Sequence, residues 1–482
     1  MRVIYFDLDT LRPDHLGCYG YGRDTSPVID SIARDGITFM DYYTPNAPCL
    51  PSRTSLFTGQ YGVRTGIVTH TGTAADLRLE GRDRTYSDVR AENGLFKQFE
   101  RAGMHTVSFS TFAPRHSAWW FNAGLREWVN IGKHGYESGE LITPHVLDWL
   151  DRKGGEDNWF MHVHYWDPHT PFRVPEDFED PFEGTPLPDD WITDEVFEGH
   201  LDTTYKDAVR EGRGNLLKDE RLGSSSFAKK LINRYDHSIR YTDYHVGQII
   251  DKLKQMNIYD DDLAIIISTD HGENYGEIGQ YCAHVTACEA TCHIPMIIKW
   301  PGCKKGHKAY GFQENVDLLP TLVELLGLQP GSARPYVMDG VSYADTLLHG
   351  ADCSKESLVL TNCVKMHQRA ARFGDYIYIR TVPGQMKMYP FEMLFDIKQD
   401  PHMQNNLAAS RPDLCAQGAK IILDWLEDIF KTSPYPTDPM WTVMREEVLK
   451  SETFLNGFSL RIREIYPEFG NQVTDDLGLR NK

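Results

Sequence analysis

Cys49 and Arg53 carry the side chains most suited to chemistry, in the segment Cys-Leu-Pro-Ser-Arg. Pro51 suits the first turn of a helix, so the residues just before it are expected at a helix N-terminus. Free N–H groups and the helix dipole favour an anion at such a place. Arg53 follows within one turn and can turn its fork of N–H donors toward the same anion. The pattern predicts a reactive group beside an anion-binding site.

Acidic residues and a histidine follow two apolar runs elsewhere in the chain. Asp9 follows the run 3–8, and Asp270 and His271 follow a second run. Ligands of α/β proteins bind at the carboxyl ends of the strands, so these side chains are expected to meet there. Oxygen-rich ligation suits calcium, with magnesium or manganese behind it. Asp7 shares the face of Asp9, and we expect it first to hold a histidine near the metal, with direct ligation as the alternative.

The elements that must position these residues alternate between strands and helices. This alternation predicts an α/β fold: a large domain with a mainly parallel mixed sheet flanked by helices. Ser26 and Pro27 suit the cap and first position of one helix. Strands are predicted at residues 3–8, 106–110, 159–165, 263–268 and 296–299, and helices at 26–35, 92–102, 227–256 and 314–326.

The pattern changes near residue 350. Short strands at 358–360, 368–373, 375–381 and 393–396, followed by a helix at about 411–430, predict a small C-terminal α+β subdomain with an antiparallel sheet. We therefore predict a catalytic domain at 1–355, this subdomain at 356–432 and a tail of unassigned structure at 433–482. Residues 173–226 are rich in Asp, Glu, Pro and Gly, and we predict a surface insertion there.

The segment 49–59 reads Cys-Leu-Pro-Ser-Arg-Thr-Ser-Leu-Phe-Thr-Gly and resembles the C-x-P-S-R…T-G signature of formylglycine-dependent sulfatases, in the alkaline phosphatase-like superfamily. Segments 9–17 and 268–273 resemble the family's metal motifs, with Thr10 in place of a usual second aspartate, and 393–401 resembles its C-terminal segment. The resemblance spans about residues 3–430. It implies an alkaline phosphatase-like fold and a maturase that acts on 49–59 and oxidises Cys49 to formylglycine. It also implies a calcium ion held by Asp9, residue 49, Asp270 and His271.

Two histidines lie in segments that resemble sulfate-binding parts of the family. Trp-Asp-Pro-His-Thr-Pro at 166–171 resembles the segment whose histidine contacts the sulfate, which implies that role for His169. Residues 276–284 resemble the stretch that carries a Lys or His on the sulfate oxygens, which implies His284 there.

One family segment is missing. Many members carry G-K-W-H, whose Lys and His bind the formylglycine and the leaving oxygen, but the equivalent residues 110–113 read Ser-Thr-Phe-Ala. Arg115, His116 and His70 are the candidates to replace them. For the proton donor, the sequence favours His116, then His284, then His70.

The resemblance implies a sulfuric ester hydrolase that cleaves a sulfate monoester through the gem-diol of formylglycine. One hydroxyl, made more acidic by calcium, attacks sulfur while a histidine protonates the leaving alcohol. The second hydroxyl then releases sulfate as the carbonyl re-forms. Trp119, Trp120 and Trp166 suit stacking on a sugar, so a small sulfated carbohydrate is the favoured substrate. A phosphonate monoester or phosphodiester hydrolase and a catalytically lapsed binder of a sulfated ligand are the alternatives.

The composition of the chain argues against some classes of binding partner. A net charge of −19 over 482 residues argues against binding to nucleic acid or to an anionic membrane. The N-terminus enters an apolar strand at once, and no run is long enough to span a bilayer, which predicts a cytoplasmic protein with reduced cysteines. The sequence leaves the oligomeric state undecided.

Overall fold

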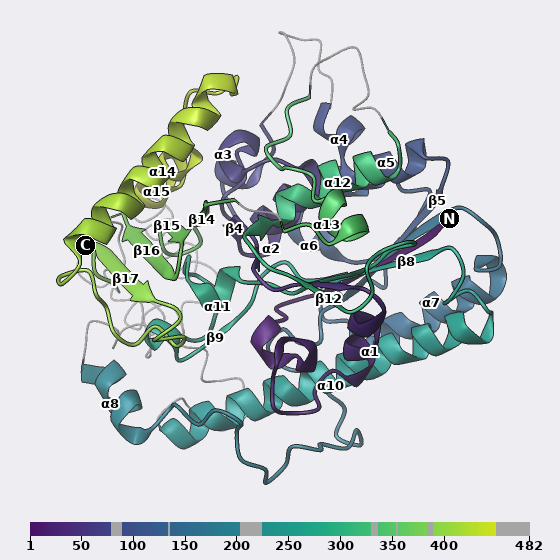
Figure 1. The fold of residues 1–482 in the computed structure, drawn as a ribbon, viewed down its shortest axis with the longest axis horizontal. Helices are drawn as coiled ribbons and strands as arrows, with labels where there is room; N and C mark the ends of the chain where they lie inside the picture. The colour runs from purple at the N-terminus through teal and green to yellow at the C-terminus, as the bar shows by residue number, and fades with distance from the viewer. Residues whose placement is uncertain are drawn as a thin grey trace, which may run out of the picture.

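A computed structural model of the chain describes residues 1–78, 89–133, 135–202, 224–328, 336–352, 355–382 and 389–449. Its centre is a mixed sheet of eight strands (Figure 1). The strands from β8 to β6 run parallel, whereas β11 is antiparallel to both of its neighbours. The order is β12 (His307–Ala309), β2 (Ile37–Phe39), β11 (Met296–Lys299), β8 (Leu263–Ser268), β1 (Arg2–Leu8), β7 (Trp159–Tyr165), β5 (His105–Phe109) and β6 (Glu127–Val129).

Helices cover both faces of this sheet. One face packs against α1 (Pro27–Asp35), α7 (Gly139–Lys153) and α10 (Ser225–Gln255), and the other against α2 (Cys49–Thr58), α5 (Leu95–Arg101) and α12 (Leu318–Leu325) (Figure 1). Side chains of strand β1 alternate between the two faces of the sheet. Ile4 and Phe6 lie in the core on the α10 face, and Val3 and Tyr5 lie in the core on the α2 face. Asp7 therefore points to the face covered by α2.

A second sheet is built mainly from the C-terminal part of the chain. Its order is β17 (Glu392–Asp396), β16 (Tyr376–Thr381), β15 (Gln368–Phe373), β14 (Ser357–Asn362) and β4 (Asn46–Ala47), and α14 (Pro412–Thr432) packs on it. The pairs are antiparallel except that of β14 with β4, where Thr361 lies opposite Asn46. Since β4 ends just before Cys49, the C-terminal sheet fixes the chain that leads into α2.

The remaining elements are short. Two small strand pairs join β9 (Asn274–Tyr275) to β10 (Tyr281–Ala283) and β3 (Tyr42–Tyr43) to β13 (Gln313–Glu314). The other helices are α3 (Gly62–Thr65), α4 (Val89–Asn93), α6 (Phe112–His116), α8 (Asp194–Asp202), α11 (Glu289–Cys292), α13 (Ala344–His349) and α15 (Pro439–Leu449).

The predicted fold class is confirmed, with a large mixed sheet between helices and a separate antiparallel sheet. The single helix predicted at 92–102 is wrong, because the chain breaks at Gly94 between α4 and α5. A Cβ at position 94 would lie 2.1 Å from the Phe57 ring, so this close approach requires glycine. The helix predicted from 314 also begins as a 3₁₀ turn before α12. Ser26 does precede α1, but Asp243 of α10 accepts the N–H groups that its hydroxyl was expected to cap.

The predicted insertion contributes to the core as well as to the surface. Ile192 and Phe197 are buried in the core on the α10 face, and α8 lies within this segment. Residues 203–223 of the insertion and 450–482 of the tail lie outside the described residues. Among the helices that the structure describes, none is long and apolar enough to cross a bilayer.

Candidate active site

Helix α2 begins at Cys49 and is buried along its whole length. The Cys49 Sγ lies 3.2 Å from the His271 Nε2. Burial and the nearby Asp9 and Asp270 raise the pKa of the Cys49 thiol well above its ordinary value, although Arg53 opposes them. The unmodified thiol is therefore protonated at neutral pH. Its Sγ stands where the oxygen of an oxidised side chain would lie.

Ser52 explains why a serine follows the proline of this segment. Its hydroxyl donates to the Asp270 carbonyl at 2.6 Å and accepts from Thr44 at 2.8 Å. The Asn315 side chain donates to the same hydroxyl at 3.0 Å. These buried hydrogen bonds fix α2 to the end of β8 and so hold Cys49 beside Asp270.

The guanidinium of Arg53 lies among three buried carboxylates. Its Nε and Nη2 donate to the two oxygens of Asp7 at 2.8 and 2.9 Å, and its Nη1 pairs with Asp270 and, at 3.2 Å, with Asp9. Burial raises the pKa of Asp7, but Arg53 outweighs burial and holds that pKa well below its usual range. The sequence had predicted that this fork would face a bound anion, whereas its bidentate contact is with Asp7.

The donor set fits a divalent cation. Ligand atoms of Asp9, Cys49, Asp270 and His271 all lie within 4.8 Å of one another. Both Asp9 oxygens are buried without a hydrogen-bond donor, and although Arg53 lies 3.2 Å from Oδ2, Oδ1 has no cationic partner among the described residues. Asp7, Asp9 and Asp270 with Arg53 leave two negative charges in this buried cluster, which is the charge that a divalent cation neutralises.

The tautomer of His271 also suits a ligand. Its Nδ1 donates to the Gly272 carbonyl at 2.8 Å, which leaves the lone pair of Nε2 facing Cys49 and Asp270. Thr10 provides no carboxylate, but its N–H donates to Asp270 at 3.3 Å. Its hydroxyl turns back to the Asp9 carbonyl, and its backbone is left-handed with φ of 60°. Such a conformation in a β-branched residue is strained, so the surrounding bonds hold this loop in place.

Two buried histidines of β7 belong to the site although the sequence analysis did not single them out. His162 Nε2 lies 3.3 Å from Asp7, and Arg53 donates to His164 Nε2 at 2.8 Å. His164 in turn donates from Nδ1 to Ser110 at 2.9 Å. Asp7 thus contacts Arg53 and a histidine. Histidines spaced two apart in a buried strand are the signal that could have revealed them, because both face the same side as Asp7.

His169 and His284 lie beside the cluster, close to His271. The ring centroid of His284 is 4.3 Å from that of His271 and 5.4 Å from that of His169. His284 Nδ1 is 3.3 Å from the buried Glu273 carboxylate. Burial lowers the pKa of His169 to about 4, and its Nδ1 donates to the Thr170 carbonyl. His284 therefore has a buried carboxylate beside its Nδ1, whereas the Nδ1 of His169 is bonded to a backbone carbonyl.

The candidates for the missing Lys and His lie on the α6 side of Cys49. His70 Nε2 accepts the Leu50 N–H at 3.4 Å, and its ring is 5.0 Å from that of His116. Burial and nearby positive groups lower the pKa of His70 to about 3 and that of His116 well below its usual value. Both rings are therefore neutral at neutral pH. Arg115 lies with its guanidinium 4.8 Å from the centroid of the Trp166 ring.

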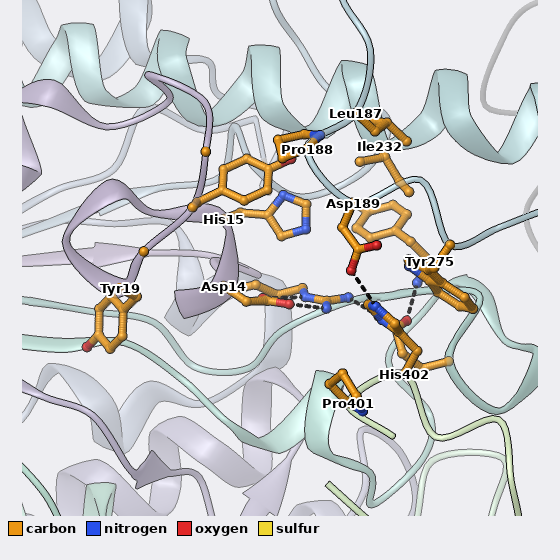
Figure 2. Close-up of a pocket in the computed structure, with 16 residues that line it drawn as sticks. Asp14, His15, Tyr19, Leu187, Pro188, Asp189, Ile232, Tyr275, Pro401 and His402 are labelled. Carbon is orange, nitrogen blue, oxygen red and sulfur yellow. Dashed lines mark hydrogen bonds and ion pairs between the residues drawn. The ribbon is translucent and has the colours of Figure 1, made fainter. Parts of the chain in front are cut away.

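A cavity of about 490 Å³ lies apart from these groups (Figure 2). His402 of the C-terminal subdomain enters it, pairs with Asp189 at 2.7 Å and stacks on Trp191 with 4.2 Å between ring centroids. Arg12 and Tyr275 also line it, but none of the candidate catalytic side chains does. The cavity therefore marks where residues 187–191 meet the C-terminal subdomain.

Comparisons with known proteins agree with this arrangement. A family model described as Sulfatase matches residues 2–328. The Ulvan-active sulfatase of Formosa agariphila is 25% identical over 460 residues, which cover 88% of this chain and 78% of that protein.

Solved structures show the same fold. The phosphonate monoester hydrolase of Agrobacterium radiobacter has a TM-score of 0.67 at 19% identity and covers 88% of this chain and 95% of its own. A protein solved with its substrate D-glucosamine-2-N,6-O-disulfate has a TM-score of 0.68 at 18% identity, with 90% and 98% covered.

Proposed function

This chain belongs to the sulfatase family, and from that premise we propose that it hydrolyses a sulfate monoester of a small carbohydrate through a formylglycine made from Cys49. The observation that carries the proposal is the placement of Cys49. It begins a buried helix, and its Sγ lies 3.2 Å from His271 beside Asp9 and Asp270, of which Asp9 has no hydrogen-bond donor on either oxygen. Hydrolysis adds water across the S–O bond and yields an alcohol and hydrogen sulfate.

Other groups of the site bind the cation, supply the nucleophile and compensate charge. Asp9, residue 49, Asp270 and His271 would hold the calcium ion, which would supply positive charge to the sulfate oxygens. Formylglycine, hydrated, supplies the oxygen nucleophile. Arg53 compensates the carboxylates that would bind the cation, and we assign contact with the sulfate to His169, whose ring lies 5.4 Å from that of His284.

The leaving alcohol needs a proton, and we assign its donor to His284. Its ring lies against His271 and its Nδ1 against Glu273, which stabilises the charged imidazole. This places His284 ahead of His116, which the sequence favoured first, because burial lowers the pKa of both His116 and His70.

A carbohydrate substrate is supported by the relatives. One matched protein is named for activity on ulvan, and a structural neighbour was solved with a disulfated glucosamine as its substrate. Of the tryptophans proposed for sugar stacking, Trp119 is 58% exposed, whereas Trp166 is only 1% exposed and packs near Arg53. Trp166 is therefore part of the wall, and Trp119 is the more exposed of the two rings.

The test begins with maturation. The protein is co-expressed with a formylglycine-generating maturase, and the peptide containing residue 49 is examined by mass spectrometry for conversion of the thiol to the aldehyde. Matured protein should then hydrolyse nitrophenyl sulfate, Cys49→Ala should not, and Cys303→Ser serves as the control cysteine variant. Faster turnover of phenyl phosphonate esters would favour the phosphonate hydrolase, and binding without turnover of either ester would favour a lapsed binder. Removal of metal by a chelator, followed by addition of calcium, magnesium or manganese, identifies the ion.

A further inference from the structure

Guanidinium groups and aromatic rings alternate on a path that leads away from Cys49. Arg53 lies 5.7 Å and Arg115 4.8 Å from the centroid of the Trp166 ring. Arg115 also lies 5.9 Å from the centroid of Tyr136, and Arg173 lies 4.9 Å from the same ring. Arg53 is fully buried, whereas Tyr136 is 62% exposed, so the path runs from the nucleophile to the surface.

Arg173 forms no ion pair with a carboxylate in the described part of the chain. Its Nη1 is buried without a hydrogen-bond acceptor, and no ion pair joins it to a described carboxylate. Asp167 attracts it electrostatically, but one Asp167 oxygen accepts the Gly139 N–H at 3.0 Å and the other has no donor. A half-buried guanidinium stays charged and lacks the acceptors that it requires. An anion that reaches Arg173 would supply them.

The guanidinium of Arg115 packs closely against the backbone of Gly135. A Cβ at Gly135 would lie 2.5 Å from the Arg115 Nη1, and Gly135 has a φ of +85°, so the guanidinium lies against bare backbone. The same loop is fixed by the buried Glu137 carboxylate, which accepts from the Gly135 N–H and from the Thr111 hydroxyl, both at 2.8 Å. The Thr111 hydroxyl also accepts from the Trp166 ring N–H at 3.2 Å. The rings and cations are therefore positioned before any ligand arrives.

We propose that Arg115, Tyr136 and Arg173 form a second anion subsite beside the scissile sulfate, which selects a sugar that carries another negative group. The inference rests on the proposed function and narrows its substrate class to sugars with a carboxylate or a second sulfate. Both groups match the fork of an arginine. A chain with net charge −19 repels such a substrate unless local cations reverse the field at the mouth of the site.

The test is the variant Arg173→Gln, assayed on matched substrates that differ by one charge. N-acetylglucosamine 6-sulfate is compared with glucosamine 2-N,6-O-disulfate, and a 2-sulfated hexuronic acid with its methyl ester. A lost charge-assisted contact should lower kcat/KM for the doubly charged member by about 10- to 100-fold. Turnover of nitrophenyl sulfate and of the singly charged members should stay within about twofold. The pair that responds identifies the second group as sulfate or carboxylate.

Three controls separate the possible outcomes. Arg152→Gln removes an exposed arginine of α7, which pairs with Asp148, and should leave every substrate unaffected. Arg173→Lys keeps the charge but loses the fork, so it should fall between wild type and Arg173→Gln. Calorimetric binding of the disulfated sugar to Cys49→Ala, with and without Arg173→Gln, gives a readout that does not require turnover.

An equal loss on all substrates, or no loss on any, would overturn the subsite. Failure of both doubly charged sugars, the disulfated one and the 2-sulfated hexuronic acid, to bind Cys49→Ala more tightly than their singly charged partners would also overturn it. Inactivity of the matured wild type toward nitrophenyl sulfate would instead contradict the proposed function, and the binding comparison would still decide the subsite.

Discussion

His284→Gln is the sharpest test of how the leaving alcohol receives its proton. The glutamine keeps a polar side chain at this buried position but cannot deliver a proton at neutral pH. The His284 ring lies 4.3 Å from that of His271, and its Nδ1 lies 3.3 Å from Glu273, so this imidazole has a buried carboxylate partner and lies next to the histidine that contacts Cys49.

The size of the effect follows from these contacts. A positioned general acid contributes about 10²- to 10⁴-fold, which is about 2.7 to 5.4 kcal/mol of barrier. Glu273 is 1% exposed, and a hydrogen bond to a charged group is worth about 1.5 to 3 kcal/mol. Glu273→Gln should therefore lower turnover by about 10- to 100-fold, less than loss of the imidazole itself.

The assay compares leaving groups. A sugar or alkyl sulfate releases a basic alkoxide that requires the proton, whereas nitrophenyl sulfate releases a stable phenolate. His284→Gln should lower kcat/KM for the alkyl ester by the full factor and that for nitrophenyl sulfate by less than about tenfold. His116→Gln and His70→Gln should show no such difference, because burial lowers the pKa of both rings and leaves them without a proton to give. Equal losses on both esters for His284→Gln would refute the assignment.

Three further changes test the metal, the packing and the pH response. Asp9→Asn should abolish the rise in unfolding midpoint that calcium causes, worth about 2.7 kcal/mol at one hundred times the dissociation constant; an unchanged response to calcium would place the ion elsewhere. Gly94→Ala places a Cβ 2.1 Å from Phe57 and should lower the free energy of unfolding by denaturant by about 1 to 3 kcal/mol. If the variant were as stable as the wild type, the contact with Phe57 would not be the reason for glycine at this position. Burial lowers the pKa of His245 to about 4 in the folded protein, so on acidification the unfolded state binds this proton before the folded state does. The free energy of unfolding should therefore decrease by at most about 3 kcal/mol as the pH is lowered from about 6.5 to 4. His245→Asn, which can still bond Thr143, should flatten that slope in unfolding titrations, and parallel slopes for the two proteins would contradict this origin.

The residues that sequence reasoning located best are those placed by local rules. Asp9 and Asp270 lie at the carboxyl ends of β1 and β8, which are neighbours in the sheet. An apolar run predicts its own strand, and a parallel sheet brings such ends together, so no knowledge of distant contacts was needed. The segment starting at Cys49 likewise predicted its own helix.

The features that were missed depend on pairing between distant parts of the chain. Asp7 lies opposite His164 because β1 and β7 are neighbours in the sheet, and an apolar run does not show which strand it will pair with. The turn of Arg53 toward Asp7 has the same origin, since its partners lie on or just after the three strands β1, β7 and β8. The break at Gly94 follows from contact with Phe57, which lies on another helix. Local patterns are silent on each of these contacts.

The missing lysine of the family's G-K-W-H segment has a physical counterpart in this chain. Thr111 stands at the lysine position and binds Trp166 and Glu137 through its hydroxyl, which fixes the wall on which Arg115 lies. The Arg115 charge reaches the nucleophile, because it lowers the pKa of the Cys49 thiol against the effect of burial. We infer that Arg115 supplies the positive charge that lysine supplies in relatives. The Arg115 guanidinium lies on the Trp166 ring and can contact the scissile sulfate and a neighbouring anion together. A lysine at residue 111 would be buried behind Trp166 and could not make both contacts.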